Sequence, residues 1–381
     1  MTRYRFEQIA VNSTAKKKPE DSDRERYIGL EHLDPGTLEV SRWGAEVTPK
    51  GDKLLMEKGD VLFGRRRAYQ KKVGIAPFDG IFSAHGMVLR PRTDVVDQGF
   101  FPFFISSDMF LDEAIRVSVG SLSPTANWKD LKVLEFSLPS LDKQRELAGI
   151  LSEAERLKGR YRSLLAACDD VVKSQFVEMF GDPVRGKSKF SKSKLGELAA
   201  ISSGATPKRD HPEYYGGSIP WVKTTEVARG NVTAAEEYIT QAGLANSSCR
   251  LVPAGSVLVA MYGQGETRGK AAMLEIEAAT NQACAAIECD PAKLDASYAL
   301  HHLHLCYEDL RSKSKGGNQK NLSLAVLKQY GLICPPLSLQ KEFAEFAASV
   351  DKSKFAVQKA LDELNAATKK ILNQELGFRD V

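Results

Sequence analysis

Two copies of one unit make up most of this chain. The segment 59–62 reads Gly-Asp-Val-Leu, and the segment 255–258, which lies 196 residues later, reads Gly-Ser-Val-Leu. A constant offset over a long span indicates tandem duplication. The chain is therefore expected to form two similar domains, and its 381 residues are enough for both. Further pairs at the same offset are Gly120 and Gly316, Leu131 and Leu327, Pro139 and Pro335, Gln144 and Gln340, Glu146 and Glu342, Lys173 and Lys369, and Gly181 and Gly377.

Each copy is expected to end in a long amphipathic helix. Apolar residues alternate at spacings of three and four over 147–171 and again over 343–371, a pattern typical of paired helices. Because a globular segment separates the two helices in sequence, an antiparallel pair is the simplest way to bury both apolar stripes. The residues predicted to pair the helices are Leu147, Ile150, Leu157 and Leu164 in the first, and Phe343, Phe346, Val350 and Leu364 in the second.

The predicted fold class is α+β, with two pseudo-symmetric α/β domains separated by two long antiparallel helices that form a coiled-coil spacer. Short β-like runs marked by glycine and proline turns fill the region before each helix. The predicted boundaries are a first domain at 1–140, a first helix at 141–181, a basic linker at 182–194, a second domain at 195–336 and a second helix at 337–377.

Composition sets few limits beyond an ordinary globular protein. The net charge is +4, so only local clusters of basic residues could indicate a polyanionic partner. The first 18 residues lack an apolar core segment, and no stretch approaches the roughly 18 apolar residues of a membrane span. Six cysteines without a C-x-x-C pair predict reduced thiols in a cytoplasmic protein.

Two motifs raise the question of catalysis. Residues 181–188 satisfy the phosphate-loop pattern G-x-x-x-x-G-K-[ST], which functions between a strand and a helix. Here a long helix is expected before the motif and a lysine-rich linker after it. We therefore interpret the motif as a linker and keep a nucleotide hydrolase as an alternative function. The segment 301–304 (His-His-Leu-His) lacks the H-E-x-x-H spacing and a nearby cysteine pair, so neither a metal site nor a catalytic residue is predicted.

Basic and amide side chains follow the repeated Val-Leu strand in both copies. Arginine and lysine bind phosphates or guanine edges, and asparagine and glutamine can pair with adenine. Equivalent placement in both copies favours a DNA interface over a merely solvated surface. The candidates after this strand are Arg65, Arg66, Arg67, Lys71 and Lys72 in the first copy, and Gln264, Arg268 and Lys270 in the second. Further donors elsewhere in the second copy are Lys208, Arg209, Lys223, Asn318, Gln319 and Lys320.

The chain resembles the specificity (S) subunit of type I restriction-modification enzymes over nearly its whole length. The matching stretches are 203–207 (Ser-Gly-Ala-Thr-Pro), 215–222 (Tyr-Gly-Gly-Ser-Ile-Pro-Trp-Val), 280–282 (Thr-Asn-Gln), 316–323 (Gly-Gly-Asn-Gln-Lys-Asn-Leu-Ser) and the Pro-Pro-Leu entry to the second helix. The first copy is divergent, and His85-Gly86 occupies the place of Asn281-Gln282 at the 196-residue offset.

This resemblance implies a non-catalytic subunit that reads a split DNA site. Each domain would bind one half of the recognition site on double-stranded DNA, and the helices would fix the length of the unread gap between the two halves. Two modification subunits, which bind S-adenosylmethionine and methylate adenine, and two restriction subunits, which use ATP and Mg²⁺, would complete the enzyme, while this chain binds no cofactor or membrane. Helices of this length span roughly 55–60 Å, which suits half-sites one to two turns apart at about 34 Å per turn. A helical scaffold that never contacts DNA remains the third hypothesis.

Overall fold

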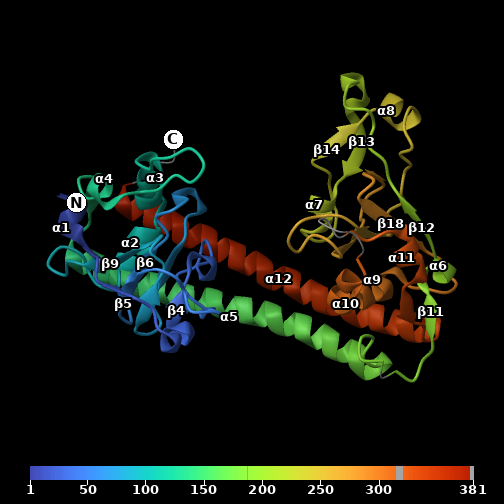
Figure 1. Ribbon diagram of the computed structural model, residues 1–381, viewed down its shortest axis with the longest axis horizontal. Helices are drawn as coiled ribbons and strands as arrows, with labels where there is room; N and C mark the ends of the chain where they lie inside the picture. The colour runs from blue at the N-terminus through green and yellow to red at the C-terminus, as the bar shows by residue number, and fades with distance from the viewer. Residues whose placement is uncertain (187, 315–320, 378–381) are drawn as a thin grey trace. The chain divides into compact units, whose positions relative to one another are not determined.

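The computed structural model describes residues 1–186, 188–314 and 321–377. The chain forms two compact units, one of Met1–Leu164 with Ala356–Val381 and the other of Leu165–Phe355. Each unit contains a globular domain and part of two long helices, α5 (Leu141–Phe180) and α12 (Leu337–Leu376) (Figure 1). The two long helices of the predicted fold are therefore present. Among the described residues, no helix combines the length and apolar character of a membrane span.

The first unit has two four-stranded sheets and an aromatic core. Phe6 contacts Phe110 at 5.0 Å between ring centroids, and Phe104 contacts Phe136 at 5.3 Å. One sheet has the order β2-β9-β6-β7 (Ala10–Ser13, Met87–Pro91, Val61–Phe63 and Val73–Ile75), and the other β3-β5-β8-β4 (Lys16–Lys17, Lys53–Met56, Gly80–Phe82 and Tyr27–Ile28). The other elements are β1 (Thr2–Arg5), paired with β10 (Glu135–Leu138), and helices α1 (Phe6–Ile9), α2 (Phe101–Ser106), α3 (Asp108–Arg116) and α4 (Trp128–Leu131).

The second unit contains a counterpart of the sheet β2-β9-β6-β7, but its other sheet is smaller than that of the first unit. Its four-stranded sheet has the order β12-β18-β15-β16 (Ala199–Ser203, Cys284–Cys289, Val257–Ala260 and Ala271–Met273), and a smaller sheet has the order β14-β13-β17 (Glu237–Ile239, Tyr215–Val222 and Ala279–Thr280). The other elements are β11 (Lys192–Lys194), paired with β19 (Gly331–Ile333), and helices α6 (Leu195–Leu198), α7 (Thr224–Val227), α8 (Gln241–Ala245), α9 (Ala296–Leu305), α10 (Tyr307–Ser312) and α11 (Leu324–Gln329).

Strand register corrects the constant offset predicted for the repeat. Val61 pairs with Leu89 in β9, and its counterpart Val257 pairs with Ile287 in β18. The offset is thus 196 residues at β6 but 198 at β9, and it returns to 196 at the long helices. The turn between β6 and β7 is two residues shorter than the turn between β15 and β16, which accounts for the shift.

The shift reassigns one predicted equivalence. Gly86 N–H donates to the Ser83 carbonyl at 3.0 Å, and Cys284 N–H donates to the Asn281 carbonyl at 3.1 Å. The structural counterpart of Asn281-Gln282 is therefore Ser83-Ala84, and the prediction that His85-Gly86 occupies this place was wrong. Identity at a fixed spacing could not reveal an insertion inside an intervening turn.

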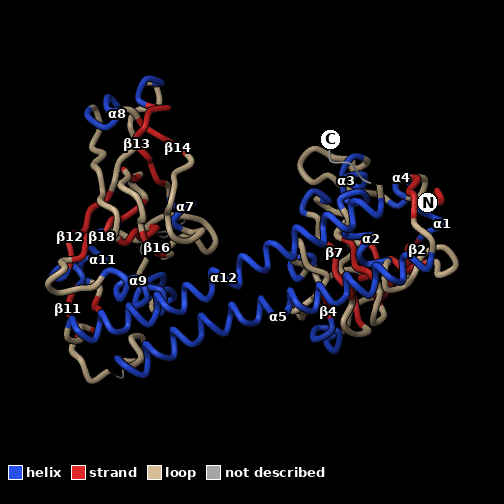
Figure 2. Tube along the Cα trace, turned by 180° about the vertical axis from the view of Figure 1, so that it is seen from behind, coloured by secondary structure: helices blue, strands red, loops and turns tan. Residues whose placement is uncertain are grey.

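Contacts within each unit show that α5 and α12 pack antiparallel (Figures 1 and 2). In the first unit, Lys143 Nζ lies 3.5 Å from a Glu375 carboxylate oxygen, and Lys158 Nζ donates to Thr368 Oγ1 at 2.7 Å. In the second unit, Lys354 forms an ion pair with Asp169, and the Phe176 and Phe343 rings are 5.2 Å apart. In each unit, the residue numbers along α5 rise while those of their contact partners along α12 fall, so the two helices run in opposite directions.

Three residues predicted to pair the helices lie outside the seam. Ile150, Leu157 and Leu164 are 48%, 38% and 46% exposed, whereas the next positions, Leu151 and Lys158, are buried. Neighbouring apolar residues at 150–151 and 164–165, and a lysine after Leu157, left two possible registers, and the sequence pattern placed the seam one residue early. The remaining predicted pairing residues are less exposed: Leu147 and Phe343 are buried, and Phe346, Val350 and Leu364 are partly buried.

A buried glutamine anchors the start of each long helix. Gln144 Oε1 accepts from Asp97 N–H at 2.8 Å, and its Nε2 donates to the carbonyls of Val95 (3.2 Å) and Pro139 (2.9 Å). In the second unit, Gln340 Oε1 accepts from Asp295 N–H at 2.9 Å, and its Nε2 donates to Lys293 O (3.1 Å) and Pro335 O (2.9 Å). The same three-bond arrangement therefore fixes how each domain joins its helix.

Replacing Gln144 with leucine is expected to destabilise the first unit. The apolar side chain leaves one N–H and two carbonyl groups without their partner, at about 1–3 kcal/mol for each group that stays buried. Hydrogen exchange should show faster exchange of amides in the first unit and unchanged exchange in the second. Gln144→Glu keeps the acceptor for Asp97 N–H but places a carboxylate oxygen against the Val95 and Pro139 carbonyls, so it is expected to destabilise the first unit at least as much. Equal protection in wild type and Gln144→Leu would contradict the anchoring role.

Candidate nucleic-acid interface

The predicted basic cluster of the first unit forms the turn that joins β6 to β7. Arg65 Nη2 donates to the Ala84 carbonyl at 3.4 Å, and Arg67 Nε donates to Ser123 Oγ at 3.4 Å. Arg66 Nη1 lies 3.4 Å from His85 Nε2. Arg66 and Arg67 are exposed, and Tyr69 between the cations is 53% exposed. The turn thus presents two guanidinium groups and one aromatic ring to solvent.

Lys71 and Lys72 bind the protein itself. Lys71 Nζ lies 3.0 Å from Asp108 and 2.8 Å from Asp112. Partial burial opposes its charge, but the hydrogen bonds to the two carboxylates outweigh this effect and raise the pKa of Lys71. Lys72 Nζ donates to the Leu30 carbonyl at 2.7 Å. Both lysines therefore fasten the end of the turn to neighbouring segments, and their predicted contact with DNA stays a prediction.

In the second unit, Arg209 lies over aromatic rings of β13. Its guanidinium carbon is 4.3 Å from the centroid of the Tyr215 ring and 5.2 Å from that of Trp221. Its Nη2 donates to Glu237 at 3.2 Å, and Lys223 Nζ donates to the same carboxylate at 3.4 Å. These two predicted DNA-binding residues are brought together by one glutamate, whose pKa the Arg209 hydrogen bond lowers. Lys208 beside them is exposed.

Gln264, Arg268 and Lys270 lie in the turn that joins β15 to β16. Gln264 is exposed, Arg268 is half-buried, and Lys270 Nζ lies 5.0 Å from the centroid of the Tyr307 ring. Arg311 Nη2 supports the turn by donating to the Gly265 carbonyl at 2.9 Å. Asn318, Gln319 and Lys320 lie outside the described residues. The structure thus places six second-unit candidates at two sites, one on β13 with its flanking segments and one after β15.

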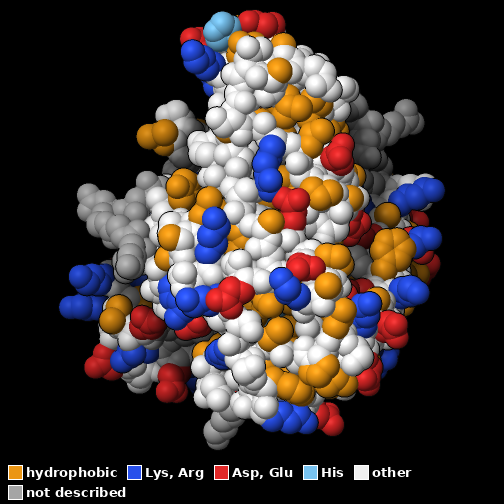
Figure 3. All heavy atoms as spheres, turned by 90° about the vertical axis from the view of Figure 1, so that its right-hand side faces the viewer, with side chains coloured by type: hydrophobic (Ala, Val, Ile, Leu, Met, Phe, Trp, Pro, Cys, Tyr) orange, Lys and Arg blue, Asp and Glu red, His pale blue; other side chains and the backbone are white. Residues whose placement is uncertain are grey.

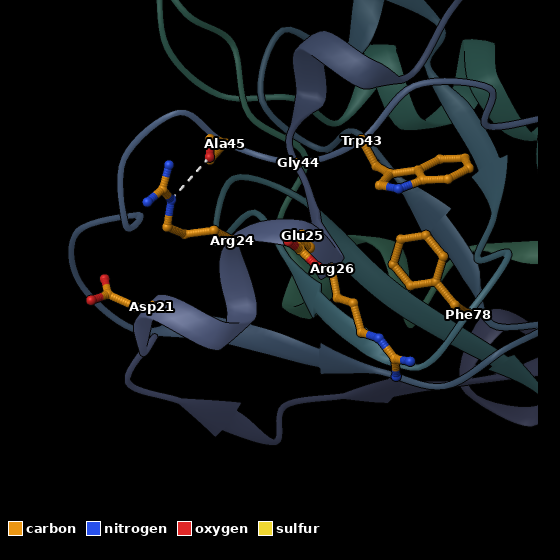
Figure 4. A pocket seen from close by; sticks show the side chains of 8 residues that line it. All are labelled: Asp21, Arg24, Glu25, Arg26, Trp43, Gly44, Ala45 and Phe78. Atoms are coloured by element: carbon orange, nitrogen blue, oxygen red, sulfur yellow. Dashed lines mark hydrogen bonds between the residues drawn. The ribbon is translucent and has the colours of Figure 1, made fainter.

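Sequence reasoning missed an aromatic cavity in the first unit. The cavity has a volume of about 690 Å³ and is lined by Trp43, Phe78, Arg24 and Arg26 among others (Figure 4). Trp43 is 49% exposed, and its ring meets that of Phe78 edge-on at 5.2 Å. The residues come from segments far apart in sequence, so no local motif indicates the cavity.

Lysine and arginine side chains are interspersed with acidic ones on the face shown in Figure 3. Because both charges are mixed on this face, it presents no broad patch of one sign, and contacts with a polyanion have to come from local turns.

The motif stretches of the second unit stabilise the fold. A side-chain Cβ at Gly204 would lie 1.8 Å from the Thr280 carbonyl oxygen, so only glycine fits this close approach. Asn281 Oδ1 accepts from Ala283 N–H at 3.1 Å, and Thr206 donates to Gln282 Oε1. These contacts join the segment after β12 to the end of β17 and the residues that follow it.

The structure argues against the phosphate-loop alternative. Helix α5 precedes the motif and β11 follows it, which reverses the strand and helix that such a loop requires. The Asp182 carboxylate accepts from the N–H groups of Val184 and Arg185 at 2.8 and 2.9 Å, so these donors are already occupied. Lys187 lies outside the described residues.

The histidine cluster has structural partners. Ile333 N–H donates to His302 Nε2 at 3.0 Å, and burial lowers the pKa of His302 to about 3, so this ring is neutral near pH 7. His304 Nε2 lies 3.0 Å from the Ala271 carbonyl. Among the described residues, no group of three potential ligands could hold a metal ion. The six cysteines are free thiols.

A family model described as the type I restriction modification DNA specificity domain matches residues 9–162 and 187–366. The chain is 21% identical over 367 residues to the type I restriction enzyme MjaVIII specificity subunit of Methanocaldococcus jannaschii, covering 91% of this chain and 84% of the relative. It is also 25% identical over 161 residues to the EcoR124I/EcoR124II specificity subunit of Escherichia coli, covering 41% of this chain and 40% of that protein.

The fold is similar to the crystal structure of the type I restriction-modification system S subunit from M. genitalium. The TM-score is 0.55 at 15% sequence identity, and the match covers all of this chain and 96% of that one. At this identity the similarity concerns the fold alone.

Proposed function

The chain belongs to the type I restriction modification DNA specificity family, and from this premise we propose that it reads a DNA target in two parts, one with each domain. The observation that carries the proposal is the duplicated sheet, from which each domain presents a different polar turn at the same place. The first turn offers Arg66, Arg67 and Tyr69, and the second offers Gln264 and Arg268. Equivalent positions with unlike side chains suit two half-sites of different sequence.

The long helices set the length of the unread gap in this proposal. Each helix has 40 residues, which corresponds to a rod of about 60 Å. The antiparallel contacts in each unit and the two buried glutamine anchors support a fixed junction between each domain and the helices. A rigid spacer lets half-site separation contribute to specificity.

Docking of two modification subunits on the helices and nearby surfaces is the second part of the proposal. Along α5, the side chains of Ile150, Leu157, Leu164 and Val171 follow one another at seven-residue spacing and are 38–50% exposed. On α12, Phe355 is 73% exposed. An exposed apolar stripe of this kind marks a surface for a partner. The modification subunits would carry S-adenosylmethionine, and two restriction subunits would carry ATP and Mg²⁺.

Mapping methylated adenines in the host genome, with and without this gene, tests the proposed function. We expect one bipartite motif with a constant gap to lose methylation when the gene is removed and to regain it on complementation. A complementing copy of the second-unit variant Gln264→Ala should change the preference in one half of the motif. Unchanged methylation without the gene would contradict the proposal, and nucleotide turnover by the purified chain would favour the hydrolase alternative.

A further inference from the structure

The turn between β6 and β7 has an unusual backbone at both ends. Arg67 has φ of 56° and Lys71 has φ of 50°, and these are the two non-glycine residues with positive φ among the described parts of the chain. They flank the short 3₁₀ turn Ala68–Gln70. Left-handed backbone is strained for a residue with a Cβ atom, and such strain is concentrated at functional sites.

The second unit uses glycine at the corresponding positions. Gly265 lies as far before β16 as Arg67 lies before β7, and its φ is 58°. Gly269, with φ of 89°, is the counterpart of Lys71. Glycine adopts these angles without a Cβ clash. The first unit thus carries two cations where the duplicated copy shows that glycine fits the fold.

Neighbouring contacts hold this strained turn rigid. Arg67 N–H donates to the Pro124 carbonyl at 2.7 Å, and Ala126 N–H donates to the Arg65 carbonyl at 3.0 Å. At the other end, Lys71 pairs with Asp108 and Asp112. The turn is therefore fixed on both sides, and Tyr69 projects from its middle.

The two left-handed residues differ in what their side chains do. Lys71 binds carboxylates, so its charge has a structural use that offsets the backbone strain. Arg67 is exposed, and its Nε donates to the Ser123 hydroxyl oxygen at 3.4 Å. One long hydrogen bond from a guanidinium to an uncharged hydroxyl stabilises the fold only weakly, compared with the cost of a strained backbone. The guanidinium of Arg67 therefore indicates a partner outside the chain.

We propose that Tyr69 is a specificity-determining residue that contacts base edges of the first half-site, while Arg66 and Arg67 bind the adjacent phosphates. This assignment rests on the proposed function. A tyrosine hydroxyl can donate to or accept from a base edge, its ring can contact a thymine methyl group, and neighbouring guanidinium groups neutralise the backbone. Lys71 acts as a positioning residue that holds the turn in its presented conformation.

Arg67→Gly separates a functional role from a structural one. Glycine relieves the backbone strain, so the thermal midpoint of the first unit should stay level or rise by about 2 °C. In the complex with modification subunits, DNA affinity should nevertheless fall, and the slope of log affinity against log salt should decrease by about one. Unchanged affinity and salt slope would overturn the role of Arg67.

Tyr69 variants test base contact directly. Methylation by the complex would be measured on a pool of DNA duplexes randomised in each half-site. Tyr69→Ala should reduce discrimination about tenfold at one or two positions of the first half-site. Tyr69→Phe keeps the ring, so it reports whether the hydroxyl contributes to that discrimination. Preference for the second half-site should stay as in wild type.

Matched controls come from the second unit. Thr267 lies as far before β16 as Tyr69 lies before β7, so Thr267→Ala should leave first-half preference unchanged. Intact first-half discrimination by Tyr69→Ala, or an equal loss in both halves, would overturn the assignment of Tyr69. A wild-type complex that methylates the pool without any preference would instead overturn the proposed function itself.

Discussion

Removing residues 161–167 from α5 together with residues 354–360 from α12 is expected to abolish methylation of the native target while the chain still folds. The deleted segments face each other in the antiparallel numbering set by Lys158 with Thr368 and Asp169 with Lys354. Each deletion removes seven residues, so the repeat that places Leu151, Lys158 and Val172 on one face is kept. The helix pair would shorten by about 10 Å, or roughly three base pairs of DNA.

Methylome sequencing of cells that express the shortened chain provides the measurement. If the helices set the gap, the native motif should lose methylation, and any new motif should have the same half-sites with a shorter gap. Deleting 161–167 alone is the control, because it shifts one helix against the other and should destabilise the protein. Full methylation of the native motif by the doubly shortened chain would contradict the spacer role.

The duplication and the long helices could be predicted because their signals are local. Repeated glycines and prolines mark the same turns in both copies, and apolar spacing of three and four residues indicates a helix in any context. The helical register was harder to assign. Lys158 is buried with its ammonium bonded to Glu155 and Thr368, and both bonds depend on folding, so hydropathy placed the seam at Leu157 instead.

For the predicted DNA interface too, some properties follow from the sequence and others only from the fold. Arginine and lysine indicate that a turn can bind an anion, but they do not show which cations already have partners in the protein. Lys71 bonds to α3, and Arg209 bonds to Glu237, which lies 28 residues away in sequence. The backbone angles of Arg67 and the exposure of Tyr69 are likewise properties of the folded turn. The strand registers of the two copies identify this turn as unusual. When the copies are aligned by register, glycine in the second copy corresponds to a cation in the first.

The double variant Leu157→Glu/Leu164→Glu is expected to block loading of the modification subunits. Both side chains are partly exposed in the chain, so replacing them should change its own stability little. In the complex, an apolar side chain buried against a partner contributes about 1.5–3 kcal/mol, and a buried unpaired carboxylate adds a further penalty. Affinity for the modification subunit should therefore fall by at least about 100-fold.

Sedimentation of the purified chain with its modification subunit provides the measurement, and Ser152→Glu/Ser163→Glu is the matched control. These serines are exposed positions of the same helix, and the control adds the same two charges away from the apolar stripe. Normal loading by the control and lost loading by the leucine variant would place the partner on the stripe. If both variants assembled normally, the stripe would not be a docking surface. Leu157 lies one residue before the buried Lys158. Lost loading by the leucine variant alone would therefore assign partner binding to the outer face of α5, distinct from the face that packs on α12.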